Sequence, residues 1–134
     1  MLVETLETAQ QWSGHGNLYQ SVRKAIETAL SAQQMDGIVM CHLSHAYRDG
    51  ASLYFTVISS QGPDGGASNW PKVKNAACEA IQKAGGTLSH HHATGSDHAT
   101  WLEGEIGTIG IDALAGIKER LDPAGIMNPG KILK

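Results

Sequence analysis

The sequence is poor in cysteine and has no long apolar run. Its two cysteines, Cys41 and Cys78, lie far apart, and we expect no secretory leader. We therefore expect two reduced thiols in a cytoplasmic protein. No apolar run approaches the roughly 20 residues that a membrane span needs, which argues against a transmembrane segment. Peripheral association with a membrane stays open.

An excess of basic residues is also missing. The net charge is −3, so the composition does not indicate a basic surface that binds nucleic acid. The composition, 41% hydrophobic and 17% charged, is that of a globular chain and neither disordered nor fibrous. We find no repeat, linker or low-complexity segment, and 134 residues fit a single domain, residues 1–134.

The first half of the chain alternates between strand and helix patterns. Residues 2–8 predict a short strand, and residues 38–47 and 51–59 predict a hairpin whose turn is the run Arg-Asp-Gly at 48–50. Between the first strand and the hairpin, apolar residues recur at a spacing of four, which predicts a helix with one buried face. That face consists of Leu18, Val22, Ile26 and Leu30.

The second half predicts two more helices and one more strand. Ser68 or Asn69 can cap a helix that ends at Gly85, and residues 87–91 predict a strand. A last helix over residues 100–121 precedes an irregular tail. Its inward residues are expected to be Trp101, Ile106, Ile109, Leu114, Ile117 and Leu121.

This order of elements predicts an α+β fold. The first six elements match the ferredoxin-like β-α-β-β-α-β pattern, in which an antiparallel sheet carries its helices on one face. The last helix and the irregular tail are additions to that pattern.

The histidines are concentrated in the segment "SHHHATGSDH", residues 89–98. Histidine changes charge near neutral pH, so such a cluster suits proton transfer or the binding of an anion, and exposed side chains without a role are the plain alternative. In a strand, His90 and His92 would point to one face and His91 to the other. By the same alternation, His42 and His45 of the hairpin would lie on opposite faces.

A metal site is the third interpretation of the histidine cluster. A His-x-His spacing can supply two ligands, but zinc takes three or four. No cysteine or carboxylate stands at a familiar interval from the histidines, so the sequence favours a site without metal.

Three stretches in order carry a family resemblance: "CHLSHAYRDGASLYFTV", "GGTLSHHHATGSDHATWLEGEIG" and "LDPAGIMNPGKIL". They resemble the C-terminal region of FAD-linked oxidases of the vanillyl-alcohol oxidase type, and most of all the alkyldihydroxyacetonephosphate synthases of ether-lipid synthesis. The opening "LVETLETAQQWS" resembles the same proteins, so the similarity covers nearly the whole chain. The "SHHH" segment is its most specific part.

The resemblance implies that this chain is the cap portion of a longer enzyme, with FAD held mainly by an FAD-binding domain outside residues 1–134. The implied chemistry exchanges an acyl for an alkyl group on a lipid precursor, with no net redox change. His90, His91 and His92 then form a histidine wall, Tyr54 is the phenol beside the reacting centre, and Asn128 contacts the cofactor. The family usually has glycine after the three histidines, where this sequence has Ala93.

Related FAD-linked 2-hydroxy acid dehydrogenases offer a second interpretation. By resemblance, their hairpin histidines and a glutamate hold a divalent metal. His45 would take the first ligand position and His91 would replace the glutamate, while Tyr54 stands in place of the second histidine. Because tyrosine, with a pKa of about 10, is a poor ligand at neutral pH, the metal-free site is preferred. A non-catalytic binding module and a homo-oligomer are further alternatives.

Overall fold

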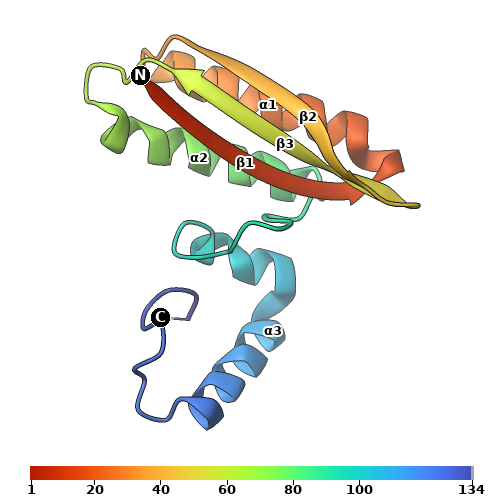
Figure 1. The fold of residues 1–134 in the computed structure, drawn as a ribbon, viewed down its shortest axis with the longest axis vertical. Helices are drawn as coiled ribbons and strands as arrows, with labels where there is room; N and C mark the ends of the chain where they lie inside the picture. Colours follow the sequence, from red (N-terminus) through yellow and green to blue (C-terminus); the bar gives the residue numbers. More distant parts are fainter. Residues whose placement is uncertain (134) are drawn as a thin grey trace. The chain divides into compact units, whose positions relative to one another are not determined.

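The computed structural model describes residues 1–133, which form two compact units (Figure 1). The first unit, Met1–His91, contains the sheet and two helices and is called the sheet unit. The second begins at His92 and is called the tail unit.

Three antiparallel strands form the sheet of the sheet unit, in the order β1-β3-β2. They are β1 (Leu2–Gln11), β2 (Gly37–Ala46) and β3 (Gly50–Ser59), which confirms the predicted first strand and hairpin. The register places Glu7 opposite Tyr54 and Leu6 opposite Phe55. Alternate residues of β3 therefore face opposite sides of the sheet.

Both long helices of this unit lie on the same side of the sheet (Figure 1). They are α1 (His15–Ala32) and α2 (Gly66–Lys83), and a 3-10 turn, Trp12–Gly14, leads into α1. The predicted apolar face of α1 is buried, as the spacing of four requires. Together with the inward residues of the strands and α2 it forms the core, whose most buried apolar side chains are Leu18, Val22, Ile26, Phe55, Val57, Val73 and Ile81.

The predicted fourth strand is wrong. Residues 87–91 follow Gly85, whose φ of +77° turns the chain sharply, and they have no strand geometry. Isolated hydrogen bonds hold the segment beside β1. The Thr87 backbone N–H donates to the Ala9 carbonyl at 3.1 Å, and the Thr8 hydroxyl donates to the Thr87 carbonyl at 2.6 Å. The segment is therefore an ordered loop, and strand alternation does not govern its histidines.

The predicted start of α2 is also late. The helix begins at Gly66, so Ser68 and Asn69 lie inside it and do not cap it. The Asn69 amide donates instead to the Gln61 carbonyl at 3.0 Å, which ties the preceding loop to the helix.

The tail unit contains α3 (Ala99–Leu121) and the irregular segment after it, as predicted. The helix is kinked at Gly107, whose φ is +72°. Its predicted inward residues are not buried in the described structure: Ile109 is 85% exposed and Leu121 is 76% exposed. The apolar pattern predicts the helix correctly, but the described residues leave much of its apolar side exposed. No helix of the described residues has the length and apolar character to cross a membrane.

Candidate functional site

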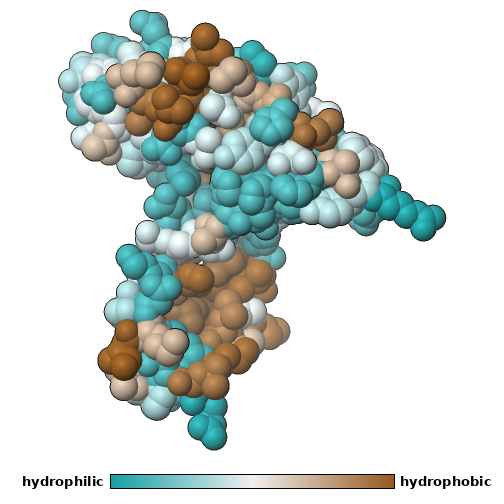
Figure 2. Space-filling model, in the orientation of Figure 1, coloured by the Kyte–Doolittle hydropathy of each residue, from teal (hydrophilic) through white to brown (hydrophobic). Residues whose placement is uncertain are grey.

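The face of the sheet opposite the helices carries the candidate site. Glu7 of β1 and Tyr54 of β3 are cross-strand partners on this face, and His42 of β2 pairs with Tyr54 on its other side. The His42 and Tyr54 rings stack, with centroids 5.2 Å apart and an interplanar angle of 26°. Exposed Val3, Ile38 and Met40 extend the same face toward the N-terminus of β1, where apolar side chains gather in Figure 2.

A bulge in β2 brings His45 to this face. The register shifts between Leu43 and Ala46. These two residues are three positions apart on β2, whereas their partners on β3, Leu53 and Ala51, are only two positions apart. An extra residue reverses the alternation that follows it. His45 therefore shares the open face with His42, and the prediction that the two lie on opposite faces is wrong.

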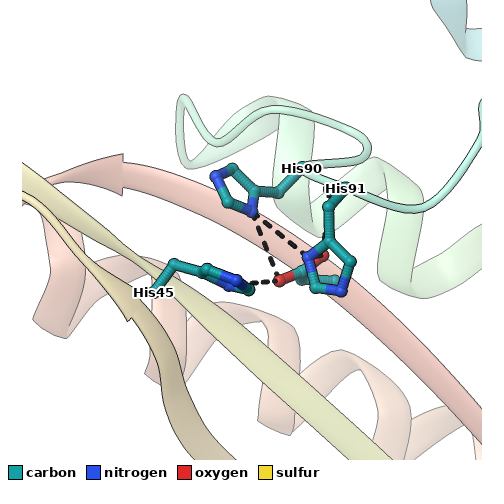
Figure 3. Close-up of side chains that lie close together, drawn as sticks. His45, His90 and His91 are labelled. Atoms are coloured by element: carbon teal, nitrogen blue, oxygen red, sulfur yellow. Dashed lines mark hydrogen bonds and ion pairs between the residues drawn. The ribbon is translucent and has the colours of Figure 1, made fainter.

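Glu7 is the centre of the cluster. Its side chain is fully buried, and the imidazoles of His45, His90 and His91 surround its carboxylate (Figure 3). The Glu7 Oε2–His91 Nδ1 distance is 2.6 Å, whereas Oε1 lies 3.4 Å from His90 Nδ1 and 3.8 Å from His45 Nδ1. The backbone N–H of His91 also donates to Oε2, at 3.1 Å. His90 and His91 thus converge on one carboxylate, in contrast to the opposite orientations that a strand would give.

Two tyrosines border this cluster. The Tyr47 hydroxyl lies 2.9 Å from His90 Nε2, a hydrogen-bond distance. The Tyr54 ring is 6.4 Å from the His91 ring, nearly parallel to it at 27°. The site therefore combines phenol, imidazole and carboxylate groups, the types of side chain used for proton transfer.

The buried carboxylate of Glu7 stays ionised. Burial acts to raise the pKa of Glu7, but hydrogen bonds from the His91 backbone and the Ser52 hydroxyl, together with the charges of His91 and His90, outweigh it. The pKa of Glu7 is consequently below its usual value of 4.5.

This lowered pKa predicts a loss of stability in acid. A carboxyl whose pKa is lower when folded contributes stability above its unfolded pKa, and that contribution disappears as the pH falls through the folded pKa. We expect the free energy of unfolding to decrease between about pH 5 and pH 3, less steeply in a Glu7→Gln variant. Urea denaturation across this range measures the slopes, with Glu4→Gln on the same strand as the control. Equal slopes for wild type and Glu7→Gln would contradict the assignment.

The same four residues are the group within residues 1–133 whose donor atoms could hold a metal. One ligand atom from each of Glu7, His45, His90 and His91 lies within 4.8 Å of the others. Three imidazoles and a carboxylate suit Zn²⁺ and related ions. The 2.6 Å contact between His91 and Glu7, however, has the length of a charge-assisted hydrogen bond, whereas two ligand atoms of a tetrahedral zinc stand about 3.4 Å apart.

The structure brings some of the predicted site residues together. Tyr54, His90 and His91 lie in the sheet unit on one face, with His45 beside them. His92 and Asn128 belong to the tail unit, and Asn128 has a positive φ of 50°. The sequence analysis missed Glu7. The signal in the sequence was weak: Glu7 is a charged residue inside the predicted strand 2–8, and only the structure shows that its side chain is buried.

Comparison with known proteins identifies relatives over the whole chain. The model of the family "FAD linked oxidases, C-terminal domain" matches residues 1–132. The alkyldihydroxyacetonephosphate synthase of Trypanosoma brucei brucei is 32% identical over 97% of this chain and 21% of its own length. That of Dictyostelium discoideum is 29% identical over 99% of this chain and 22% of its own length.

A bacterial relative and a solved structure complete the comparison. An uncharacterized FAD-linked oxidoreductase of Escherichia coli O157:H7 is 31% identical over 96% of this chain and 27% of its own length. A solved alkyldihydroxyacetonephosphate synthase matches 95% of this chain and 20% of its own chain, with a TM-score of 0.63 and 24% identity. That structural likeness supports the α+β fold. The chain spans about a fifth to a quarter of the length of these relatives.

Proposed function

Because this chain belongs to the family of FAD-linked oxidase C-terminal domains, we propose that it is the cap portion of a longer FAD-dependent enzyme that exchanges an acyl for an alkyl group on a lipid precursor. The observation that carries the proposal is the convergence of Tyr54, His90 and His91 on the open face of the sheet. A fatty acid must leave and a fatty alcohol must enter in such an exchange. The incoming alcohol must lose its hydroxyl proton, and the departing carboxylate needs a hydrogen-bond donor or a positive charge beside it.

The open face suits a planar aromatic cofactor. The stacked His42 and Tyr54 rings and the exposed Met40 and Ile38 present aromatic and apolar side chains against which a ring can pack. When bound, FAD supplies the electrophilic and redox-active ring system. We assign most of its binding to an FAD-binding domain outside this chain and assign Asn128 as a contact from the tail unit.

The residues of this chain supply proton transfer and charge. His91 exchanges a proton with the substrate oxygens, and the Tyr54 hydroxyl hydrogen-bonds to the reacting group. His90 extends the histidine wall beside His91, where an imidazole N–H can stabilise the departing carboxylate; a role of His92, which belongs to the tail unit, rests on the family resemblance alone. Burial raises the pKa of the Cys41 thiol to about 11, which argues against Cys41 as a nucleophile.

The exposed apolar side of α3 supports a partner in the same enzyme. Ile109, Ile117 and Leu121 are 85%, 57% and 76% exposed, and such a run is unusual on a free surface. We assign this side of α3 to contact with the FAD-binding domain. In the isolated chain the same surface would favour homo-oligomers. We assign the enzyme to the cytoplasm, with peripheral membrane contact as a second possibility.

A metal-assisted 2-hydroxy acid dehydrogenase is the second candidate function. The observation in its favour is Glu7, because it supplies the carboxylate that the sequence analysis found missing beside His45 and His91.

One set of assays separates the two functions. The chain is expressed with its upstream flavin-binding region and tested for alkyl exchange on acyl-dihydroxyacetone phosphate and for 2-hydroxy acid oxidation. We expect exchange activity without added metal, and a decrease in kcat of about 10²-fold in Tyr54→Phe, which removes one hydroxyl involved in proton transfer. Tyr19→Phe is the matched control. Metal-dependent 2-hydroxy acid oxidation without exchange would replace the proposal by the second candidate.

A further inference from the structure

We propose that Glu7 is the positioning residue of this site: its buried carboxylate holds His91 with the proton on Nδ1, which makes Nε2 the nitrogen that exchanges a proton with the substrate. The inference deepens the proposed function. Its activity test depends on that function, whereas its spectroscopic test does not.

The contact between Glu7 and His91 fixes both the backbone and the ring of the histidine. Oε2 accepts the His91 backbone N–H at 3.1 Å and faces Nδ1 of the same residue at 2.6 Å. A side chain on an irregular loop can adopt several rotamers, and a backbone hydrogen bond together with a 2.6 Å ring contact to one buried carboxylate restricts them. Glu7 itself is held in the middle of β1, opposite Tyr54.

The chemistry of the carboxylate decides which ring nitrogen carries the proton. An ionised carboxylate accepts hydrogen bonds and cannot donate them, whereas neutral imidazole has one donor and one acceptor nitrogen. The 2.6 Å contact therefore requires hydrogen on Nδ1 of His91. Nε2 is then the basic nitrogen. When it takes a proton, the imidazolium that forms is stabilised by the adjacent negative charge, and the proton is later returned from Nε2.

The neighbouring histidine is oriented by the same carboxylate. Glu7 Oε1 is buried without a well-formed hydrogen bond within the described residues, and His90 Nδ1 lies 3.4 Å from it. The Tyr47 hydroxyl, 2.9 Å from His90 Nε2, can donate to that nitrogen. His90 Nδ1 lies 3.4 Å from both Glu7 Oε1 and His91 Nδ1, so it can donate to the carboxylate or accept from His91. His45 approaches Oε1 from β2 at 3.8 Å, so three imidazoles surround one negative charge.

The spectroscopic test uses the 134-residue chain labelled with ¹⁵N at histidine. Ring ¹⁵N shifts distinguish protonated from unprotonated nitrogens. We expect His91 to carry its proton on Nδ1 in the wild type and to lose this preference in Glu7→Gln, whose amide can donate as well as accept. The control, Glu4→Gln, makes the same change on the opposite face of β1 and should leave the His91 spectrum unchanged.

Several results would overturn the inference. One is a wild-type His91 with its proton on Nε2, which needs no variant and so does not depend on Glu7→Gln folding. Another is an unchanged His91 spectrum in a folded Glu7→Gln variant. A third is stoichiometric zinc or manganese in the purified wild type that is lost in Glu7→Gln, since Glu7 would then be a metal ligand.

The activity test uses the enzyme with its flavin-binding region. Glu7→Gln should lower kcat about 10²-fold, as expected for a misdirected proton acceptor, with KM nearly unchanged because Glu7 does not face the substrate directly. A Glu7→Gln enzyme with full kcat but an altered His91 spectrum would overturn the catalytic part of the inference. If neither wild type nor variant is active, the proposed function fails while the spectroscopic result still stands or falls on its own.

Discussion

Replacing His91 by alanine should lower kcat of the flavin-containing enzyme by about 10²- to 10⁴-fold, the range that a placed general acid or base contributes. The His91 imidazole lies 2.6 Å from Glu7 Oε2, and its ring centroid is 6.4 Å from that of Tyr54. Its side chain is 46% exposed, so a substrate can reach it. Alanine removes the group that exchanges the proton and leaves the backbone contact to Glu7.

A second substitution at position 91 distinguishes a loss of proton transfer from a loss of folded structure. Asparagine at position 91 places an amide N–H near the position of Nδ1 and can keep the hydrogen bond to Glu7, but it has no counterpart of Nε2. His91→Asn should therefore fold like the wild type and still lose kcat to the same extent as His91→Ala. Steady-state kinetics and thermal melts of the three proteins provide the comparison. Full turnover in His91→Ala would show that His91 is not catalytic.

The second large effect concerns stability. Phe55→Ala should reduce the free energy of unfolding by about 3–5 kcal/mol, the usual cost of emptying a buried aromatic position. Phe55 is fully buried on the helix side of β3, opposite Leu6 and Cys41 on the two neighbouring strands. Its ring also stacks on that of Tyr19 from α1, with centroids 6.2 Å apart. The substitution thus removes contacts that join both outer strands and a helix.

Urea denaturation followed by circular dichroism measures this loss. Ile38→Ala is the control, because Ile38 lies on the open face and is 65% exposed, so its truncation should cost less than about 1 kcal/mol. Similar effects for the two variants would mean that the core does not lie where the structure places it.

Local sequence patterns predicted the scaffold well. The helix face of Leu18, Val22, Ile26 and Leu30 and the three strands were recovered because periodicity follows directly from helix and strand geometry. The apolar pattern of α3 was equally visible, but the described residues leave most of that side exposed. The family could also be recognised from the "SHHH" segment and its neighbours.

The candidate site could be predicted only in part. The sequence pointed to the histidines and to Tyr54, since their residue types and their resemblance to a family do not depend on exact geometry. It assigned the faces wrongly, because it treated residues 87–91 as a regular strand and the hairpin as free of bulges. One extra residue before Ala46 was enough to bring His45 to the other face.

The amino-acid sequence by itself therefore determined the three strands, the buried face of α1 and the family, because each of these is set by short-range spacing or by motifs of residue type. The tertiary structure alone decided that Glu7, 84 positions before His91, is the carboxylate around which three histidines gather. Such a contact depends on the order of the strands, a bulge and a loop docked beside β1. No short-range sequence pattern encodes this combination of strand order, bulge and loop position.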